Sequence, residues 1–228
     1  KVSAISLFSG CGGVDIGAHM AGVKIVAAID FDKDSVETMK LNKQFNNTRI
    51  FHEDVVKFDK DIFKNILKTE KHDKFILIGG PPCQPFSKAG YWIGNNKRKG
   101  EKDPRNMIGE YLKTLKKLNP DGFLFENVDS LLHPTNKHIV DMIIKIAESY
   151  DYNVLLIRIN AIEYGVPQKR RRIFILGSKQ KFKKQEPKKT HGDSKSGLKP
   201  FESVGKFIQK FDSNEYIEKE ESVKGGTY

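Results

Sequence analysis

The sequence has few of the features that mark secreted or membrane-bound proteins. Its 228 residues include two cysteines, too few for a disulfide framework and suited to a reducing cytosol. No apolar run approaches membrane-spanning length, and the N-terminus lacks the pattern of a secretory signal peptide. The chain begins at Lys1 rather than at methionine, so we expect it to be a trimmed form. Its length suits one good core plus an appendage.

The charge of the chain is unbalanced and locally concentrated. Lysine and arginine number 40 against 29 acidic residues, a formal net charge of +11. Residues 97–105 carry five basic and two acidic side chains, residues 169–172 carry four basic ones, and residues 179–199 carry eight lysines and two acids. Such patches predict a polyanionic partner, of which nucleic acid is the natural case. For residues 179–199, a solvated lysine-rich loop explains the pattern equally well.

Short apolar runs alternate with helix-like segments as far as about residue 178. This alternation predicts an α/β fold with a mainly parallel sheet and helices on both of its faces. The expected strands are 2–8, 24–29, 49–51, 75–78, 122–125, 152–159 and 172–176. The expected helices are 14–21, 33–41, 107–118 and 138–149.

The composition changes after Gly177. Residues 179–200 are rich in lysine, poor in large apolar side chains and interrupted by proline and glycine, which is typical of a connector. Residues 201–211 show only weak helical periodicity. We therefore predict one domain over residues 1–178, followed by a basic connector and the start of an incomplete region over residues 179–228.

A cysteine comes directly after one of the expected strands. The apolar run at 75–78 leads into Gly79-Gly80-Pro81-Pro82-Cys83, where two glycines and two prolines impose an abrupt turn of restricted geometry. A thiol on so stiff a strand exit has the placement that a nucleophile above a cleft requires. The alternative is a proline-rich surface turn whose cysteine has no chemical role.

The other unusual residues also stand at the ends of expected strands. Five strands are followed in order by Phe8-Ser9-Gly10-Cys11-Gly12-Gly13, by Asp30-Phe31-Asp32, by Asp54, by Pro82-Cys83-Gln84 and by Glu126-Asn127-Val128. In an open α/β sheet, ligands bind at the carboxyl ends of the strands. This order therefore predicts that the five segments meet at one edge of the sheet and form a single site.

The first of these segments are suited to an adenosine-type cofactor. The glycine loop lets backbone amides approach a ligand at a helix start, although Asp15 stands where a dinucleotide fingerprint has its third glycine. Asp30 can hold ribose hydroxyls, Phe31 can stack on adenine, and Asp54 can accept from the adenine amino group. The absence of a Walker lysine argues against a triphosphate. Alternatives stay open: a mere tight turn for the loop, helix caps for Asp30 and Asp32, and a core position for Phe31.

Glu126 offers a candidate acid. It follows the apolar run Phe123-Leu124-Phe125 and therefore enters a partly apolar site. Such surroundings raise the pKa of a carboxyl group, which suits proton donation. A buried, paired glutamate with a structural role is the alternative.

Four segments, in this order, resemble motifs of the DNA (cytosine-5) methyltransferases, over about residues 3 to 178. Leu7-Phe8-Ser9-Gly10-Cys11-Gly12-Gly13 is similar to the motif that binds S-adenosylmethionine. Pro82-Cys83-Gln84, Glu126-Asn127-Val128 and Gln168-Lys169-Arg170-Arg171-Arg172 are similar to the catalytic proline–cysteine, E-N-V and Q-x-R-x-R motifs. The resemblance implies the Rossmann-like fold of S-adenosylmethionine-dependent methyltransferases, with a mixed, mostly parallel sheet.

The resemblance also implies roles for individual positions. Cys83 would be the nucleophile and Glu126 the group at N3 of cytosine. Arg170 and Arg172 would lie around the target base. The S-adenosylmethionine site would contain Phe8, Ser9, Gly10, Cys11, Gly12, Gly13, Asp30, Phe31, Asp54, Val55, Gly80, Pro82 and Ile108. Nucleic-acid contacts would come from Gln84, Ser87, Lys97, Arg98, Lys99 and Arg105. Cys11 falls at a variable position of its motif, so we interpret its thiol as inert packing.

The implied reaction transfers a methyl group from S-adenosylmethionine to C5 of a cytosine in double-stranded DNA and releases S-adenosylhomocysteine. The base must leave the duplex, and addition of the thiolate at C6 makes C5 nucleophilic. Neighbouring arginines would favour the thiolate, and the basic segment 97–105 would close over the nucleic acid and contact phosphates. We expect a bacterial, cytoplasmic enzyme of a restriction–modification system, with neither a metal nor a membrane partner.

The sequence departs from the family after the Q-x-R-x-R motif. A target-recognition region and a later G-N-S/A-V helix that completes the cofactor site do not appear before Tyr228. The chain is therefore truncated or partly ordered, is one subunit of a split enzyme completed by a second polypeptide, or has decayed, which the intact motifs argue against. A transfer-RNA cytosine-5 methyltransferase and a non-catalytic nucleic-acid-binding subunit stay open as alternatives. The broken glycine fingerprint disfavours an oxidoreductase.

Overall fold

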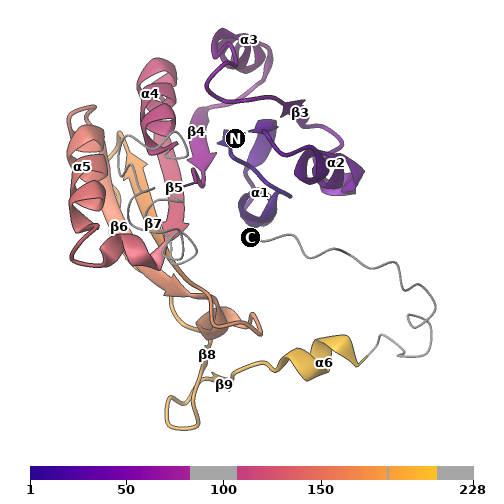
Figure 1. Ribbon diagram of the computed structural model, residues 1–228, viewed down its shortest axis with the longest axis vertical. Coiled ribbons are helices and arrows are strands. Elements are labelled where there is room, and N and C mark those ends of the chain that lie inside the picture. The colour runs from indigo at the N-terminus through magenta and orange to yellow at the C-terminus, as the bar shows by residue number, and fades with distance from the viewer. Residues whose placement is uncertain (83–106, 184, 210–228) are drawn as a thin grey trace, which may run out of the picture. The chain divides into compact units, whose positions relative to one another are not determined.

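The computed structural model describes residues 1–82, 107–183 and 185–209 (Figure 1). The chain divides into two compact units, Lys1–Arg158 with Ile173–Gln185, and Ile159–Arg172 with Glu186–Tyr228. The domain boundary expected at residue 178 stays a prediction. Outside the described residues lie Cys83, Gln84, Ser87, Lys97, Arg98, Lys99 and Arg105.

A seven-stranded sheet forms the framework of the fold. Its strands stand in the order β3-β2-β1-β4-β5-β7-β6. They are β1 Val2–Leu7, β2 Lys24–Asp30, β3 Arg49–His52, β4 Lys74–Gly79, β5 Gly122–Val128, β6 Asn153–Asn160 and β7 Arg171–Ser178. The strands from β3 to β5 pair in parallel. The expected mixed, mostly parallel α/β sheet is confirmed.

Helices cover both faces of the sheet. They are α1 Gly13–Met20, α2 Lys33–Leu41, α3 Asp61–Thr69, α4 Ile108–Leu118 and α5 Lys137–Glu148. The larger buried cluster joins α3, α4 and α5 to one face, through side chains such as Phe63, Leu115 and Ile143. The smaller one joins α1 and α2 to the other, through Met39 and its neighbours. Burial on both faces explains the nearly continuous apolar runs of β1 and β2.

The register of the strands aligns their carboxyl ends. Leu7 pairs with Ile29 of β2 and with Gly79 of β4, and Gly79 pairs in turn with Phe125 of β5. The next residues along these strands, Asp30, Phe8, Gly80 and Glu126, therefore stand in one row across the edge of the sheet. The chain leaves β1 toward β2 on one side and later returns to β4 on the other. Such a reversal of strand order opens the crevice in which α/β proteins bind ligands.

The second unit is built around a short turn. The 3₁₀ turn Ala161–Tyr164 is joined by the short strands β8 His191–Gly192 and β9 Lys199–Pro200, and by α6 Val204–Ile208. The Lys189 ammonium lies 2.7 Å from the Glu163 carboxylate, and the Thr190 amide donates to the carbonyl of Glu163. The segment expected to be a plain connector thus contains paired strands. Within the described parts of the chain, no helix is long and apolar enough to cross a membrane.

Candidate active site

The glycine loop after β1 is a strained turn with an open surface. Gly10 and Gly12 have φ values of 53° and 84°, and Phe8 also has a positive φ, of 54°. The Gly12 amide donates to the carbonyl of Ser9 at 2.9 Å, which closes the turn before α1. A Cβ on Gly12 would lie 2.7 Å from the Phe45 ring, whereas one on Gly10 or Gly13 would meet nothing within 4 Å. The loop therefore requires glycine at position 12 and leaves space beside positions 10 and 13.

The Asp30 carboxylate ties the end of β2 to this loop. Its Oδ2 accepts from the Gly10 amide at 2.7 Å, and its Oδ1 accepts from the Asp32 amide at 2.9 Å. Asp32 caps α2, because its Oδ2 accepts from the Ser35 amide at 2.8 Å. Bonding to Ser35 lowers the pKa of Asp32. The capping alternative thus holds for Asp32, while Asp30 fixes the glycine loop at the sheet edge.

Two side chains near this loop are exposed. The side chain of Phe31 is 75% exposed, so the alternative of a core position for it is wrong. His52 Nε2 donates to the carbonyl oxygen of Phe31 at 3.1 Å and so holds the backbone there. Cys11 is also exposed, with its thiol 3.8 Å from the Ser35 hydroxyl. The interpretation of the Cys11 thiol as packing is therefore wrong, and its chemical inertness stays a prediction.

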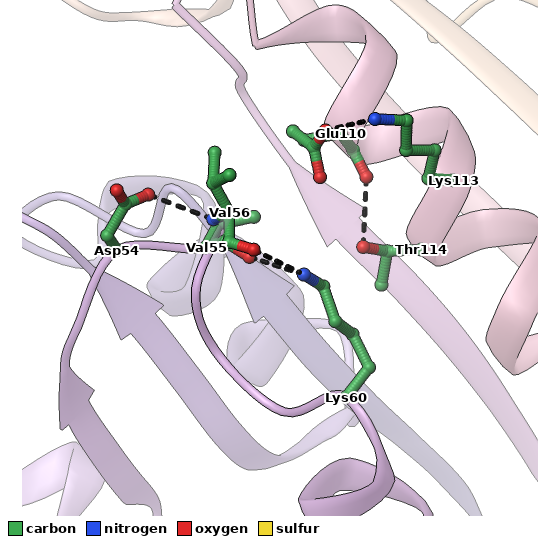
Figure 2. Close-up of polar contacts among 7 residues, drawn as sticks. All are labelled: Asp54, Val55, Val56, Lys60, Glu110, Lys113 and Thr114. Carbon is green, nitrogen blue, oxygen red and sulfur yellow. Dashed lines mark hydrogen bonds and ion pairs between the residues drawn. The ribbon is translucent and has the colours of Figure 1, made fainter.

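The turn after β3 presents the next candidate group (Figure 2). Oδ1 of Asp54 accepts from the Val56 amide at 2.9 Å, and the carbonyl of Asp54 accepts from the amides of Lys57 and Phe58. Its second carboxylate oxygen has no hydrogen-bond partner among the described residues. Val55, in this turn, and Ile108, the first residue of α4, are both buried in the larger core cluster.

Glu126 lies against the exit of β4. A Cβ on Gly80 would be 3.0 Å from Oε2 of Glu126, so the missing side chain at position 80 makes room for the carboxylate. Glu126 is half-buried at the end of β5, where the register row places it beside Gly80. The structure thus places this carboxylate beside Gly80, which precedes Cys83 by three residues along the chain. The predicted rise in the pKa of Glu126 stays a prediction.

Two hydrogen bonds fix the backbone that leads into Cys83. The side-chain amide of Asn127 donates to the carbonyl oxygen of Pro81 at 2.9 Å, and this bond is buried. The amide of Met107 donates to the carbonyl oxygen of Pro82 at 3.2 Å. The chain therefore leaves this point at Pro82 and returns to it at Met107, one residue before α4 begins.

Tyr111 braces the two strands that carry this part of the site. It is fully buried, and its hydroxyl lies 3.1 Å from the carbonyl of Leu124 and 3.3 Å from that of Leu77, one on each strand. A Cβ on Gly79 would lie 2.8 Å from the Tyr111 ring, so the ring packs on the backbone of β4. Burial raises the pKa of Tyr111 well above its ordinary value, which keeps the hydroxyl a donor.

The two candidate arginines, Arg170 and Arg172, belong to the second unit, whose first segment ends at Arg172. Arg170 is exposed, and its carbonyl accepts from the Ala161 amide at 2.9 Å. Arg172 is half-buried at the start of β7, with its guanidinium 2.8 Å from the carbonyl of Arg171. The bond between Ala161 and Arg170 thus ties the backbone at the candidate arginines to the 3₁₀ turn Ala161–Tyr164.

Sequence reasoning missed several groups that shape the site. Asn127 received no role, because an E-N-V motif alone does not reveal the bond to Pro81. Asp15 is fully buried in the first turn of α1, and neither of its oxygens makes a well-formed hydrogen bond to a described residue. Burial raises its pKa to about 6, and the Ser6 hydroxyl opposes this rise only in part. Among the described residues, no three His, Cys, Asp or Glu side chains are arranged to hold a metal.

The fold is that of the methyltransferases that use S-adenosylmethionine. A solved protein described as a DNA modification methyltransferase, encoded within a prophage of E. coli, superposes with a TM-score of 0.62. It is 30% identical, over 78% of this chain and 47% of its own. Dnmt2 of Spodoptera frugiperda superposes equally well, at 0.62 with 23% identity over 82% of this chain and 54% of its own, which shows the shared fold alone.

The sequence comparisons narrow this class to one family. The model described as C-5 cytosine-specific DNA methylase matches residues 2–227, so the chain belongs to that family. It is 34% identical to the type II methyltransferase M.AquIA of Picosynechococcus, over 88% of this chain and 85% of the relative. It is 38% identical to M.FnuDI of Fusobacterium nucleatum, over 76% of this chain. The chain spans most of the former and 46% of the latter.

Proposed function

We propose that this chain is the cofactor-binding and catalytic part of a bacterial DNA (cytosine-5) methyltransferase that acts within a restriction–modification system. The observation that carries the proposal is the row of Asp30, Phe8, Gly80 and Glu126 across one sheet edge, beside the fixed entry to Cys83. Membership of the cytosine methylase family supports the same reaction.

The residues at the edge fit S-adenosylmethionine. Open space beside Gly10 and Gly13 can accept the methionine part, and the exposed Phe31 ring can stack on adenine. Asp30 faces the loop from the end of β2, where a carboxylate can accept from ribose hydroxyls. The second oxygen of Asp54, which bonds to no described residue, can accept from the adenine amino group. When bound, this cofactor supplies a methyl group as an electrophile. The remaining candidates of the site are Ser9, Cys11, Gly12, Val55, Gly80, Pro82 and Ile108.

Cys83 and Glu126 would then activate the cytosine. The thiolate of Cys83 adds to C6 and forms an S–C bond, while Glu126 interacts at N3 and favours the shift of electrons into the ring. C5, now nucleophilic, takes the methyl group. Loss of the proton at C5 then breaks the S–C6 bond and returns the thiolate. Arg170 and Arg172 would stabilise the thiolate and hold the flipped base.

The remaining parts would serve the nucleic acid. Residues 1–178 form the methyltransferase domain, and residues 179–228 form the basic connector and the start of the target-recognition region. Double-stranded DNA is the substrate, with phosphate contacts from the basic segment 97–105. A second polypeptide can supply the C-terminal motifs, and the enzyme works in the bacterial cytoplasm at the nucleoid.

Transfer of labelled methyl groups tests the proposal. The protein, with any polypeptide that completes it, is incubated with tritiated S-adenosylmethionine and either duplex DNA or transfer RNA, and the nucleosides are identified by mass spectrometry. We expect 5-methylcytosine in DNA only. Methylation of transfer RNA alone would favour the RNA enzyme, and no transfer to either, despite measurable DNA binding, would favour a non-catalytic subunit.

A further inference from the structure

Lys60 stands at a position where a lysine is locally unfavourable. It is the N-cap of α3, where serine, threonine, aspartate or asparagine usually accepts a bond from the first turn. Its side chain makes no capping bond. Its positive charge also lies at the positive end of the helix dipole, which costs stability. The Asp59 carboxylate accepts from the Asp61 amide at 2.9 Å, so the first turn of the helix has an acceptor without Lys60, and the contacts of the Lys60 side chain lie elsewhere.

The side chain of Lys60 reaches back to the turn after β3 (Figure 2). Its ammonium donates to the carbonyl oxygen of Val55 at 2.5 Å and lies 3.4 Å from that of Val56. The bond to Val55 is partly buried. A charged donor in such a place makes a stronger hydrogen bond than a neutral one. Lys60 thus satisfies carbonyls at the C-terminal side of the turn.

The same turn orients the Asp54 carboxylate. Oδ1 of Asp54 accepts from the Val56 amide, and Lys60 holds the carbonyl of Val55, which belongs to the same peptide unit as that amide. The peptide between Val55 and Val56 is therefore fixed at both ends, by the carboxylate on one side and by the ammonium on the other. Rotation of this peptide would release the carboxylate.

We propose that Lys60 is a positioning residue for the cofactor site: it locks the Val55–Val56 peptide and thereby aims the second carboxylate oxygen of Asp54 at the adenine amino group. The inference rests on the proposed function, because it deepens the assignment of Asp54. Lys60 does not touch the cofactor. It acts on adenine recognition, since its bonds within the described residues go to the Val55 and Val56 carbonyls and not to the backbone before Cys83.

Binding of S-adenosylhomocysteine to Lys60→Met, measured by isothermal titration calorimetry, tests the inference. Methionine keeps the apolar stem and removes the donor. We expect the dissociation constant to rise about tenfold, the effect of losing one charge-assisted bond from the turn. In the methylation assay, KM for S-adenosylmethionine should rise likewise while kcat changes less than about twofold. Lys60→Arg keeps a donor and should retain most of the affinity.

Lys57→Met is the matched control. Lys57 is exposed in the same turn and contributes its backbone amide there, so the variant removes the same charge without removing a side-chain bond. It should bind like the wild type. Equal affinity of wild type and Lys60→Met, or an equal loss in Lys57→Met, would overturn the role of Lys60 and leave the proposed function standing. A wild-type protein that binds no S-adenosylhomocysteine, even together with any polypeptide that completes it, would overturn both.

Discussion

The side-chain amide of Asn127 holds the carbonyl of Pro81, two residues before Cys83, across the gap between β5 and β4. The Oδ1 of the same side chain accepts from the Val128 amide at 2.9 Å, so both ends of the amide are engaged. Glu126 belongs to β5, whereas Pro81 follows β4, so this bond links the strand of Glu126 to the backbone that leads toward Cys83. It therefore connects the segments that carry the proposed acid and the proposed nucleophile.

Replacing Asn127 with alanine should lower activity more than cofactor binding. The buried carbonyl of Pro81 would lose its partner, which costs about 1–3 kcal/mol of stability. A shift of about 1 Å in the backbone before Cys83 would lower kcat on the order of a hundredfold. Single-turnover methylation and titration with S-adenosylhomocysteine measure the two effects separately.

Asn136→Ala gives the control for this variant. Its side-chain amide donates to the carbonyl of Ser130 at 3.1 Å, a similar bond away from the Cys83 entry. It should lose stability without a comparable loss of kcat. Equal losses of kcat in the two variants would show that the Asn127 effect is general destabilisation.

A methyl group at position 80 should displace Glu126. The new Cβ of Gly80→Ala would lie 3.0 Å from Oε2 of Glu126, a contact that pushes the carboxylate aside by a few tenths of an ångström. We expect kcat to fall about tenfold, because a general acid must lie within hydrogen-bond reach of its target. Gly17→Ala, in α1 with nothing within 4 Å of its Cβ, should leave kcat unchanged. Full activity of Gly80→Ala would argue against a catalytic position for Glu126.

Alanine substitutions at two positions of the glycine loop can distinguish the cost of backbone strain from the cost of steric crowding. Gly10 and Gly12 both have positive φ, so alanine at either position costs about 1–2 kcal/mol. At Gly12 the Cβ would also lie 2.7 Å from the Phe45 ring, whereas at Gly10 it would meet nothing within 4 Å. Urea denaturation should therefore show a larger loss of stability for Gly12→Ala than for Gly10→Ala. The opposite order would contradict the close approach of α1 to Phe45.

The buried Asp15 should make stability depend on pH. Its pKa is raised from 3.8 to about 6 in the folded protein, so the folded state binds its proton more tightly than the unfolded state does. The stability that this protonated acid contributes is fully present below about pH 4 and is lost as the pH rises through about 6. At pH 8, the charged group costs up to about 3 kcal/mol.

Asp15→Asn should therefore be more stable than the wild type at pH 8, by about 1–3 kcal/mol, and this gain should vanish near pH 4. Urea denaturation at pH 8, 6 and 4 measures the difference. Asp141→Asn makes the same change at an exposed position of α5 and should show no such trend. A stability difference for Asp15→Asn that stays constant with pH would refute the raised pKa.

The sequence predicted the positions of the strands better than the contacts between them. Apolar runs between polar turns located the carboxyl ends of the strands, so Asp30, Phe31 and Asp54 were predicted at their places. Glu126 was expected to follow a strand and instead lies within β5. The bond of Asn127 to Pro81 joins residues 46 positions apart, and no local pattern reports such a pairing. This pairing depends on the register between the parallel strands β4 and β5.

Helix α3 and the contacts of Lys60 could not be predicted from the sequence either. Residues 61–69 have apolar side chains at 62, 63, 66 and 67, a helical spacing that is too brief to stand out beside the neighbouring lysines. When α3 is not predicted, nothing in the sequence distinguishes Lys60 from the neighbouring lysines. Its function in the fold follows only from the backbone path that brings the Val55 carbonyl within its reach.

The most direct test of the catalytic assignment is a covalent trap. The protein, completed if necessary, is incubated with S-adenosylmethionine and duplex DNA that carries 5-fluorocytosine in its target sites. Because the fluorine at C5 cannot leave as a cation, the S–C6 bond persists after methyl transfer. Mass spectrometry should then find the methylated base attached to Cys83, and no adduct in a Cys83→Ser variant that still binds DNA. An adduct on another residue, or methylation of normal DNA by Cys83→Ser at the wild-type rate, would contradict the account.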